Sequence, residues 1–241
     1  MHRFANPTRF LRIANAILPW SAAVMVIALA VGLTYGLVLS PPDYQQGETV
    51  RIMYVHVPSS WMALFVYTAM AVASFVYLVW KHPVADLAAR SSAAAGAAFT
   101  VISLSTGALW GKPMWGAWWV WDARLTSMLI LLFLYLGYMA LANAFDDRQR
   151  GSKAAAVLAL VGWVNIPIIK FSVDWWNTLH QPASVNPVGE SGIAIDGSML
   201  VPLFAMAIAF KAYYVTTLLM GIRREIAAAK VRTLRLAEVQ G

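Results

Sequence analysis

Tryptophan is concentrated at one point of this 241-residue chain, in the segment WGKPMWGAWWVWDARLTS that covers residues 110–127. The flat indole rings offer a wide apolar surface, and an acid and a base, Asp122 and Arg124, stand near its end. A lipid–water interface also enriches tryptophan, but such a belt spreads its residues around a protein. The segment therefore favours a ligand platform over a membrane anchor, with five tryptophans as its candidate surface: Trp110, Trp115, Trp118, Trp119 and Trp121.

After Pro113, the segment is predicted to form a short helix that lies on the surface of the protein. Four residues then share one helical face by i, i+3, i+4, i+7 spacing, namely Trp115, Trp118, Trp119 and Asp122. Such a face is an aromatic shelf with a polar end. The remaining tryptophans near the ends of apolar runs are interpreted as interfacial anchors, namely Trp20, Trp61, Trp80 and Trp163.

Two of the four histidines, His56 and His180, lie in the stretches that flank the tryptophan segment, and each is close to the end of an apolar run. The other two, His2 and His82, lie among basic residues elsewhere. A lone histidine is more often structural than a ligand. Because two histidines flank one aromatic shelf, a role as a pair of ligands is as well supported here as a structural role.

Haem fits this combination of residues. Its macrocycle is flat and apolar, its iron accepts axial imidazole, and its two propionates favour arginine or lysine. A quinone would also stack on the shelf, but it needs no histidine pair. We therefore predict His56 and His180 as axial ligands of haem iron, and we expect the propionates near three cations, Arg51, Lys112 and Arg124.

The composition places these residues in a membrane protein. Of all residues, 60% are hydrophobic and only 12% are charged, whereas a soluble domain is about 25% charged. Because about 20 apolar residues cross a bilayer as a helix, we predict an all-α integral membrane protein with six transmembrane helices. The predicted spans cover residues 17–39, 60–80, 87–109, 125–145, 154–171 and 199–221. We expect a single polytopic domain over residues 1–241, with NIPII (165–169) kinking the fifth helix.

The distribution of basic residues predicts the orientation. If both termini are cytoplasmic, thirteen of the 18 lysines and arginines lie in inner segments and only four in outer ones, as the positive-inside rule requires. The outer segments, about 40–59, 110–127 and 172–198, then hold both candidate histidines and the shelf. The basic tail, about 222–241, is predicted to extend the sixth helix into the cytoplasm. Lys211 remains as a charge within that helix, where it snorkels, pairs with another helix or contacts a partner.

Several kinds of function are disfavoured. The chain has no cysteine, which excludes thiolate metal sites and a C-x-x-C-H attachment site for haem. It has no Walker A loop, H-E-x-x-H or G-x-S-x-G motif, and its basic charge is accounted for by topology and lipid contact rather than by nucleic acid. Small-residue runs, GLTYG (32–36) and SSAAAGAA (91–98), are interpreted as close contacts between helices.

The tryptophan segment resembles the WWD signature of haem-handling proteins of cytochrome c biogenesis. With DYQQG, RIMYVHVP, NAFDDR and DWWNTLHQ, nearly the whole chain resembles the CcmC family of haem exporter proteins. The resemblance implies non-covalent, transient binding of b-type haem at the periplasmic face of a bacterial inner membrane. It also implies that haem is presented to the haem chaperone CcmE, with CcmA, CcmB and CcmD as further partners. The implied role is delivery rather than enzymatic catalysis.

Two other functions stay open from the residues alone. One is an ABC-type permease subunit that translocates haem or another substrate, although the spans offer little polar path. The other is a scaffold in which the tryptophans serve only as anchors. If haem binding depends on the tryptophans, the delivery function is supported; if it does not, the scaffold function is supported.

Overall fold

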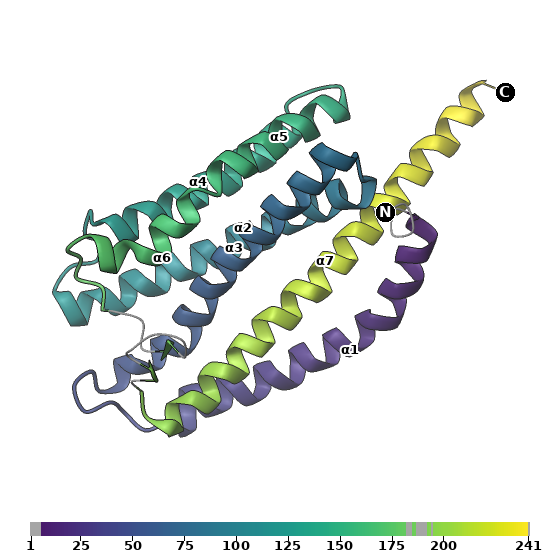
Figure 1. Cartoon of the computed structure of the whole chain (residues 1–241). Coiled ribbons are helices and arrows are strands. Elements are labelled where there is room, and N and C mark those ends of the chain that lie inside the picture. The colour runs from purple at the N-terminus through teal and green to yellow at the C-terminus, as the bar shows by residue number, and fades with distance from the viewer. Residues whose placement is uncertain (1–5, 182–184, 187–191, 194, 241) are drawn as a thin grey trace.

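The computed structural model describes residues 6–181, 185–186, 192–193 and 195–240, and it is almost entirely helical (Figure 1). The helices are α1 (Pro7–Thr34), the π-helix η2 (Tyr35–Leu39), the 3-10 helix η3 (Glu48–Ile52), α2 (Met53–Trp80), α3 (Pro83–Trp115), α4 (Ala123–Asn143), α5 (Arg148–Gly162), α6 (Asn165–Trp175) and α7 (Gly197–Gln240). Two antiparallel two-residue strands, β1 (Val185–Asn186) and β2 (Gly192–Ile193), lie between α6 and α7.

Six helical segments of the described chain are long and apolar enough to cross a membrane, which confirms the predicted number of spans. Most are longer than predicted; the second, for example, covers Glu48–Trp80 and begins within the predicted outer segment 40–59. Helix starts are fixed by side chains that accept hydrogen bonds from the first turn, namely Asn6, His82, Asp122 and Asp147.

The fifth span is broken, as the NIPII motif predicts. Helix α5 ends at Gly162 and α6 begins at Asn165, so that Pro167 falls in the first turn of α6. Proline is tolerated there because the first turn of a helix has no internal partner for its amide groups. The two helices together form one span, Arg148–Trp175, which ends on the side of the bundle where the tryptophan segment lies.

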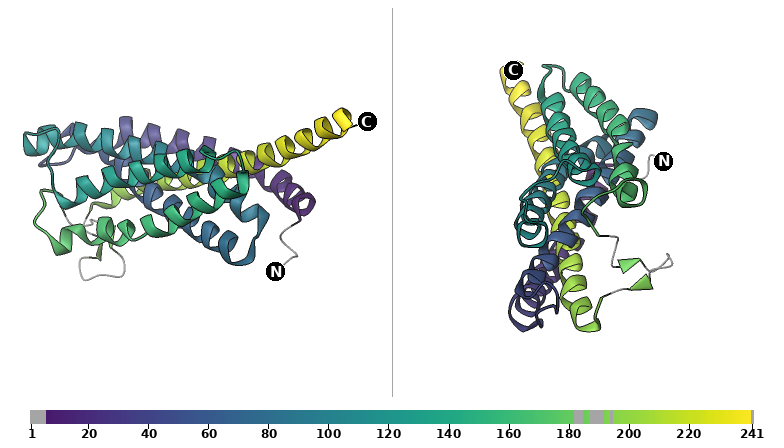
Figure 2. Two further views of the ribbon diagram at one scale, coloured as in Figure 1. Left: turned by 90° about the horizontal axis from the view of Figure 1, so that it is seen from above. Right: turned by 90° about the vertical axis from the view of Figure 1, so that its left-hand side faces the viewer.

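The helices pack with α2 and α3 at the centre (Figure 1). One side of this central pair is covered by α7, against which α1 packs, and the other side by α4, α5 and α6. Two views at right angles show that the helices run roughly along one common axis (Figure 2). The core at their centre contains fully buried tyrosines, Tyr67 and Tyr135.

Glycines allow the closest helix contacts, which confirms the interpretation of the small-residue runs. A Cβ added at Gly32 of α1 would lie 2.7 Å from the Met206 sulfur of α7, and one at Gly96 of α3 would lie 2.2 Å from the Tyr135 ring of α4. Any larger residue would force these helices apart.

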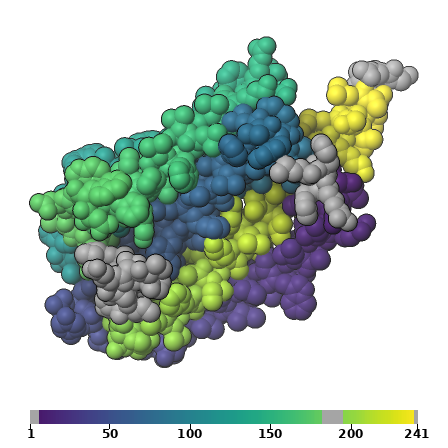
Figure 3. Space-filling model, viewed as in Figure 1, coloured from purple at the N-terminus to yellow at the C-terminus, as the bar shows by residue number. Residues whose placement is uncertain are grey.

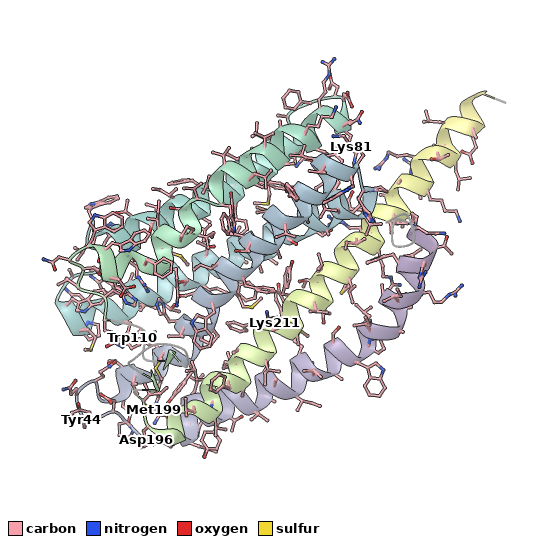
Figure 4. The ribbon with its side chains drawn as sticks, viewed as in Figure 1. Tyr44, Lys81, Trp110, Asp196, Met199 and Lys211 are labelled. Atoms are coloured by element: carbon pink, nitrogen blue, oxygen red, sulfur yellow. The ribbon has the colours of Figure 1, made fainter. Side chains whose placement is uncertain are left out.

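The start of α1 and the end of α7 lie at the same end of the bundle, where Lys81 also lies (Figures 1 and 4). Tyr44, Trp110 and Asp196 lie at the opposite end. The basic tail continues α7 as one helix beyond the bundle, as predicted. The described parts of the three segments predicted to share the outer side therefore meet at one end, which we call the loop end; it comprises residues 40–52, 116–122, 176–181, 185–186, 192–193 and 195–196.

Candidate functional site

A cavity of about 460 Å³ opens at the loop end, between α2, α3, α4, α6 and the beginning of α7. Its volume lies in the range of about 300–1,000 Å³ that holds small organic ligands. Aromatic and imidazole rings contribute to its wall, together with aliphatic side chains, two cations and the carboxylate of Asp174. The rings belong to His56, Trp61, Trp110, Trp115, Trp119, Phe171 and His180.

The tryptophan segment does not form the predicted surface helix. Helix α3 continues through Pro113 to Trp115, and Gly116 ends it with a positive φ of 75° while its N–H bonds the Lys112 carbonyl. Residues 116–122 are then non-helical until Asp122 caps α4. The prediction of one helical face from Trp115 to Asp122 was therefore wrong, because a glycine in the left-handed region is a strong stop signal for a helix.

His56 lies in the second turn of α2, inside the span rather than in a loop, and its ring is positioned by α3. Its Nδ1 lies 3.0 Å from the Ser103 carbonyl and 3.1 Å from Thr106 Oγ1. A carbonyl only accepts, so Nδ1 carries the proton and Nε2 keeps its lone pair. Gly107 leaves room for the ring, since a Cβ there would lie 3.0 Å from His56 Cε1.

His180 comes from the segment after α6 and meets His56 in the cavity. Its Nδ1 lies 3.0 Å from the Gln181 carbonyl, which again leaves Nε2 with the lone pair. The ring centres of the two histidines are 6.5 Å apart and their planes differ by 33°. Burial lowers the pKa of His180; the nearby Arg124 adds to this lowering, and the bond to Gln181 and the charge of Asp122 oppose it. Its neutral form is therefore favoured.

The tryptophans of the segment fall into two groups. Trp110, Trp115 and Trp119 line the cavity. Trp118 and Trp121 lie outside the lining and are 56% and 75% exposed. The outer group is still in contact with the inner one, because the Trp119 and Trp121 rings meet edge to face with centres 5.4 Å apart.

Trp61 and Gln46 are among the lining residues that were not predicted from the sequence. Trp61 was interpreted as a membrane anchor, but it lines the cavity from α2. Gln46 accepts a hydrogen bond of 2.9 Å from Trp110 Nε1 and so fixes the ring of Trp110. The turn that carries Gln46 is closed by Asp43, whose Oδ1 accepts from the amides of Gln45 and Gln46. The sequence signal for this turn was Asp43 at its first position, because aspartate there accepts hydrogen bonds from the backbone amides that follow.

Two buried polar atoms of the tryptophan segment have no hydrogen-bond partner in the described structure: Nε1 of Trp119, which lines the cavity, and Oδ2 of Asp122, which does not. Asp122 uses its other oxygen, Oδ1, to accept from the Leu125 amide at 2.8 Å. Buried polar groups are rarely left unpaired. A donor without an acceptor at a cavity wall is therefore a point at which a ligand oxygen would be stabilised.

The three predicted propionate contacts lie in different places. Arg124 lines the cavity, where its Nε donates to Ser172 Oγ at 3.0 Å and so joins α4 to α6. Arg51 pairs with Glu48, and Lys112 donates to the Gly116 carbonyl; neither lines the cavity. Lys170, which was not predicted as a contact, supplies the second cation of the wall. Arg124 and Asp122 are close in sequence, but they form no ion pair in the described structure.

The fold defines a multi-pass helical membrane protein with a cavity at one end. The model of the CcmC family, described as Heme exporter protein C, matches residues 1–237, and the chain belongs to this family. The chain is similar to Heme exporter protein C of Bradyrhizobium diazoefficiens, with 57% identity over 97% of this chain and 88% of that protein. The chain is also similar to the protein of the same name from Escherichia coli K12, with 46% identity over 99% of this chain and 96% of that protein.

A relative also occurs outside bacteria. A mitochondrial protein of Marchantia polymorpha, named as ccmC-like and for cytochrome c biosynthesis, is 48% identical over 79% of this chain and 77% of its own length. The similarity thus covers the helices and the loop end together, rather than the tryptophan segment alone.

Proposed function

We propose that this protein binds haem in the cavity at the loop end and presents it to the haem chaperone CcmE during cytochrome c maturation. The names of its relatives support haem handling, and one relative's name refers to cytochrome c biosynthesis. On this proposal the loop end lies at the periplasmic face of the bacterial inner membrane, as the excess of cations at the opposite end favours.

The observation that carries the proposal is the pairing of His56 and His180 across the cavity. Two imidazoles that bind one metal ion from opposite sides, each at about 2 Å from nitrogen to metal, have ring centres about 6 Å apart. The observed separation of 6.5 Å fits this arrangement. Both rings also use Nδ1 for a backbone carbonyl, which fixes the tautomer and leaves Nε2 for the metal.

The ligand must bring the other metal ligands itself. Among the described residues, no group of three or more histidines, cysteines, aspartates or glutamates is placed to hold a metal ion. Two imidazoles alone suit iron that already carries four porphyrin nitrogens. Without cysteine the chain forms no thioether to haem, so the proposed binding is non-covalent and reversible, as delivery requires.

The remaining wall suits the two other parts of haem. Trp110, Trp115 and Trp119 give an apolar surface that excludes water from the macrocycle. The propionates are expected to use Arg124, Lys170 and the unpartnered Trp119 Nε1–H. These groups would orient haem in the cavity before it leaves.

Transfer requires that haem meet another protein at the open side of the cavity. Trp118 and Trp121 are exposed, and both are close in sequence to the lining residue Trp119, whose ring contacts that of Trp121. We propose that they contact the acceptor, and that the family partners CcmA, CcmB and CcmD form the surrounding assembly. In this role the chain holds and orients haem, and the covalent bond forms on the acceptor rather than on this protein.

The test is transfer of haem between purified proteins. The detergent-purified protein, loaded with haem and freed of excess, is mixed with the soluble domain of CcmE, and covalent haem is measured on a denaturing gel. Loading of the chaperone should exceed that from free haem at the same concentration. His56→Ala should lower it, whereas His82→Ala, at the far end of the bundle, should not. Equal loading from free haem would refute the delivery function.

A further inference from the structure

Lys211 is a charge in the middle of a membrane span. It lies halfway along the membrane-spanning part of α7 (Figure 4). The rise of about 1.5 Å per residue places it about 21 Å from Gly197 and about 18 Å from Arg223. A lysine side chain reaches only about 6 Å, so Lys211 cannot bring its ammonium group to either membrane surface.

Among the residues that the structure describes, no acid lies at the depth of Lys211. The described aspartates and glutamates occupy the ends of the spans or the segments between them: Asp43, Glu48, Asp86, Asp122, Asp146, Asp147, Asp174, Asp196, Glu225 and Glu238. Glu190 lies outside the described residues, in the segment between α6 and α7. The ion pairs of the described structure accordingly include none with Lys211.

The surroundings of Lys211 are apolar and face outward. Its Nζ lies 3.1 Å from the ring centre of Phe65 on α2, which gives a cation–π contact but no counter-charge. Phe65 is 43% exposed, and Ile208, one turn before Lys211 on α7, is 53% exposed. An ammonium group held on such a face is costly in hydrocarbon unless an anion joins it.

The face is also recessed. Helix α2 packs against both α7 and α5, and the space-filling view shows the surface of α2 and α3 set back between α7 and the α5–α6 side (Figure 3). Lys211 stands at the edge of this recess (Figure 4). It is not among the residues that line the haem cavity, which ends on α7 at Leu203.

We propose that the recess beside α7 receives a transmembrane helix of a partner protein, and that this helix carries an aspartate or glutamate that pairs with Lys211. A lipid phosphate does not satisfy the charge, because it lies at the surface of a hydrocarbon core about 30 Å thick. A carboxylate on a partner helix reaches the required depth, and polar pairs of this kind hold helices together in bilayers.

The test uses the protein in its own membrane with its native partners. A photo-crosslinking amino acid replaces Ile208, one turn before Lys211 on α7, or, as a control, Phe133, which is exposed on α4. Helix α4 packs against α3, α5 and α6 rather than against α7. We expect the probe at 208 to give one defined protein adduct whose crosslinked helix contains an acid. Lys211→Met should reduce this adduct about threefold to fifteenfold, the range of an interhelical polar contact. The control at 133 should not depend on Lys211.

A charge exchange completes the test. Lys211→Glu should abolish the adduct, and replacing the partner's acid with lysine should restore it. Adducts with lipid alone, or an adduct that Lys211→Met and Lys211→Glu leave unchanged, would overturn the proposal. Weakened haem binding by purified Lys211→Met protein would also overturn it, by assigning Lys211 to a haem carboxylate. Failure of haem binding in the wild-type protein, with the crosslink intact, would instead refute only the proposed function.

Discussion

The imidazole rings of His56 and His180 have centres 6.5 Å apart and planes inclined by 33°, although one belongs to α2 and the other to the segment after α6. Each ring is tied by Nδ1 to a carbonyl of its surroundings. The pair is thus oriented by the fold, and its Nε2 atoms are the free positions for a metal.

Gly107→Ala should weaken haem binding without removing any ligand. The new methyl group would lie 3.0 Å from His56 Cε1 and displace the ring by a few tenths of an ångström. We expect an affinity loss of about tenfold to a hundredfold, as for other disturbed supporting contacts of metal ligands. The measurement is a haem titration followed by the Soret band. Gly137→Ala, which meets only a Leu158 methyl group at 3.2 Å, is the matched control. Equal affinity in both variants would show that Gly107 does not position His56.

The two groups of tryptophans should have separable effects. Trp115→Ala or Trp119→Ala removes cavity wall and should lower haem affinity about tenfold. Trp118→Ala should leave affinity nearly unchanged but reduce transfer to CcmE, because its ring lies outside the lining. Trp20→Ala, exposed near the middle of α1, should change neither. If all these variants reduce transfer only in proportion to lost protein, the tryptophans are anchors.

Haem binding should resist mild acid. Burial lowers the pKa of His180 from the ordinary value of 6.5, so the neutral, metal-binding form persists as the pH falls to that value. Affinity should therefore stay level from about pH 8 to 6.5 and decline only below, where protons compete for Nε2. Titrations at each pH, with helix content checked by circular dichroism, measure this. A decline centred at or above pH 6.5 in folded protein would contradict the lowered pKa.

The orientation can be read from single cysteines, since the chain has none of its own. Tyr44, 91% exposed at the loop end, and Lys81, in the turn at the opposite end, are suitable positions. An impermeant thiol reagent should label Tyr44→Cys in intact cells, and Lys81→Cys only after the cells are opened. The reverse pattern would place the cavity in the cytoplasm and refute presentation at the periplasmic face.

The general features of the fold were predictable because long apolar runs have only one way to cross a bilayer. The six spans, the break before Pro167 and the tight packing at Gly32 and Gly96 all follow from local composition. The end of α3 was missed, because the i, i+3, i+4 spacing of the tryptophans was given more weight than Gly116, which stops the helix there.

The site was only partly predictable, since residues from separate spans meet in it. Residue type and position next to the ends of predicted spans were enough to single out His56, His180 and the tryptophans that line the cavity. Trp61 and Lys170 could not be assigned, because which side of a helix faces the cavity depends on the packing of its neighbours. The same holds for Arg51, which pairs with Glu48 instead.

The most direct test of the central claim is the absorption and electron paramagnetic resonance spectrum of haem bound to the purified protein. The wild type should give the spectrum of iron with two imidazole ligands. Each single variant, His56→Ala and His180→Ala, should lose it, and free imidazole should partly restore it. The double variant should bind haem only weakly, while His82→Ala, whose ring caps α3 at the far end, should match the wild type. A wild-type spectrum in the His56→Ala/His180→Ala protein would contradict the account.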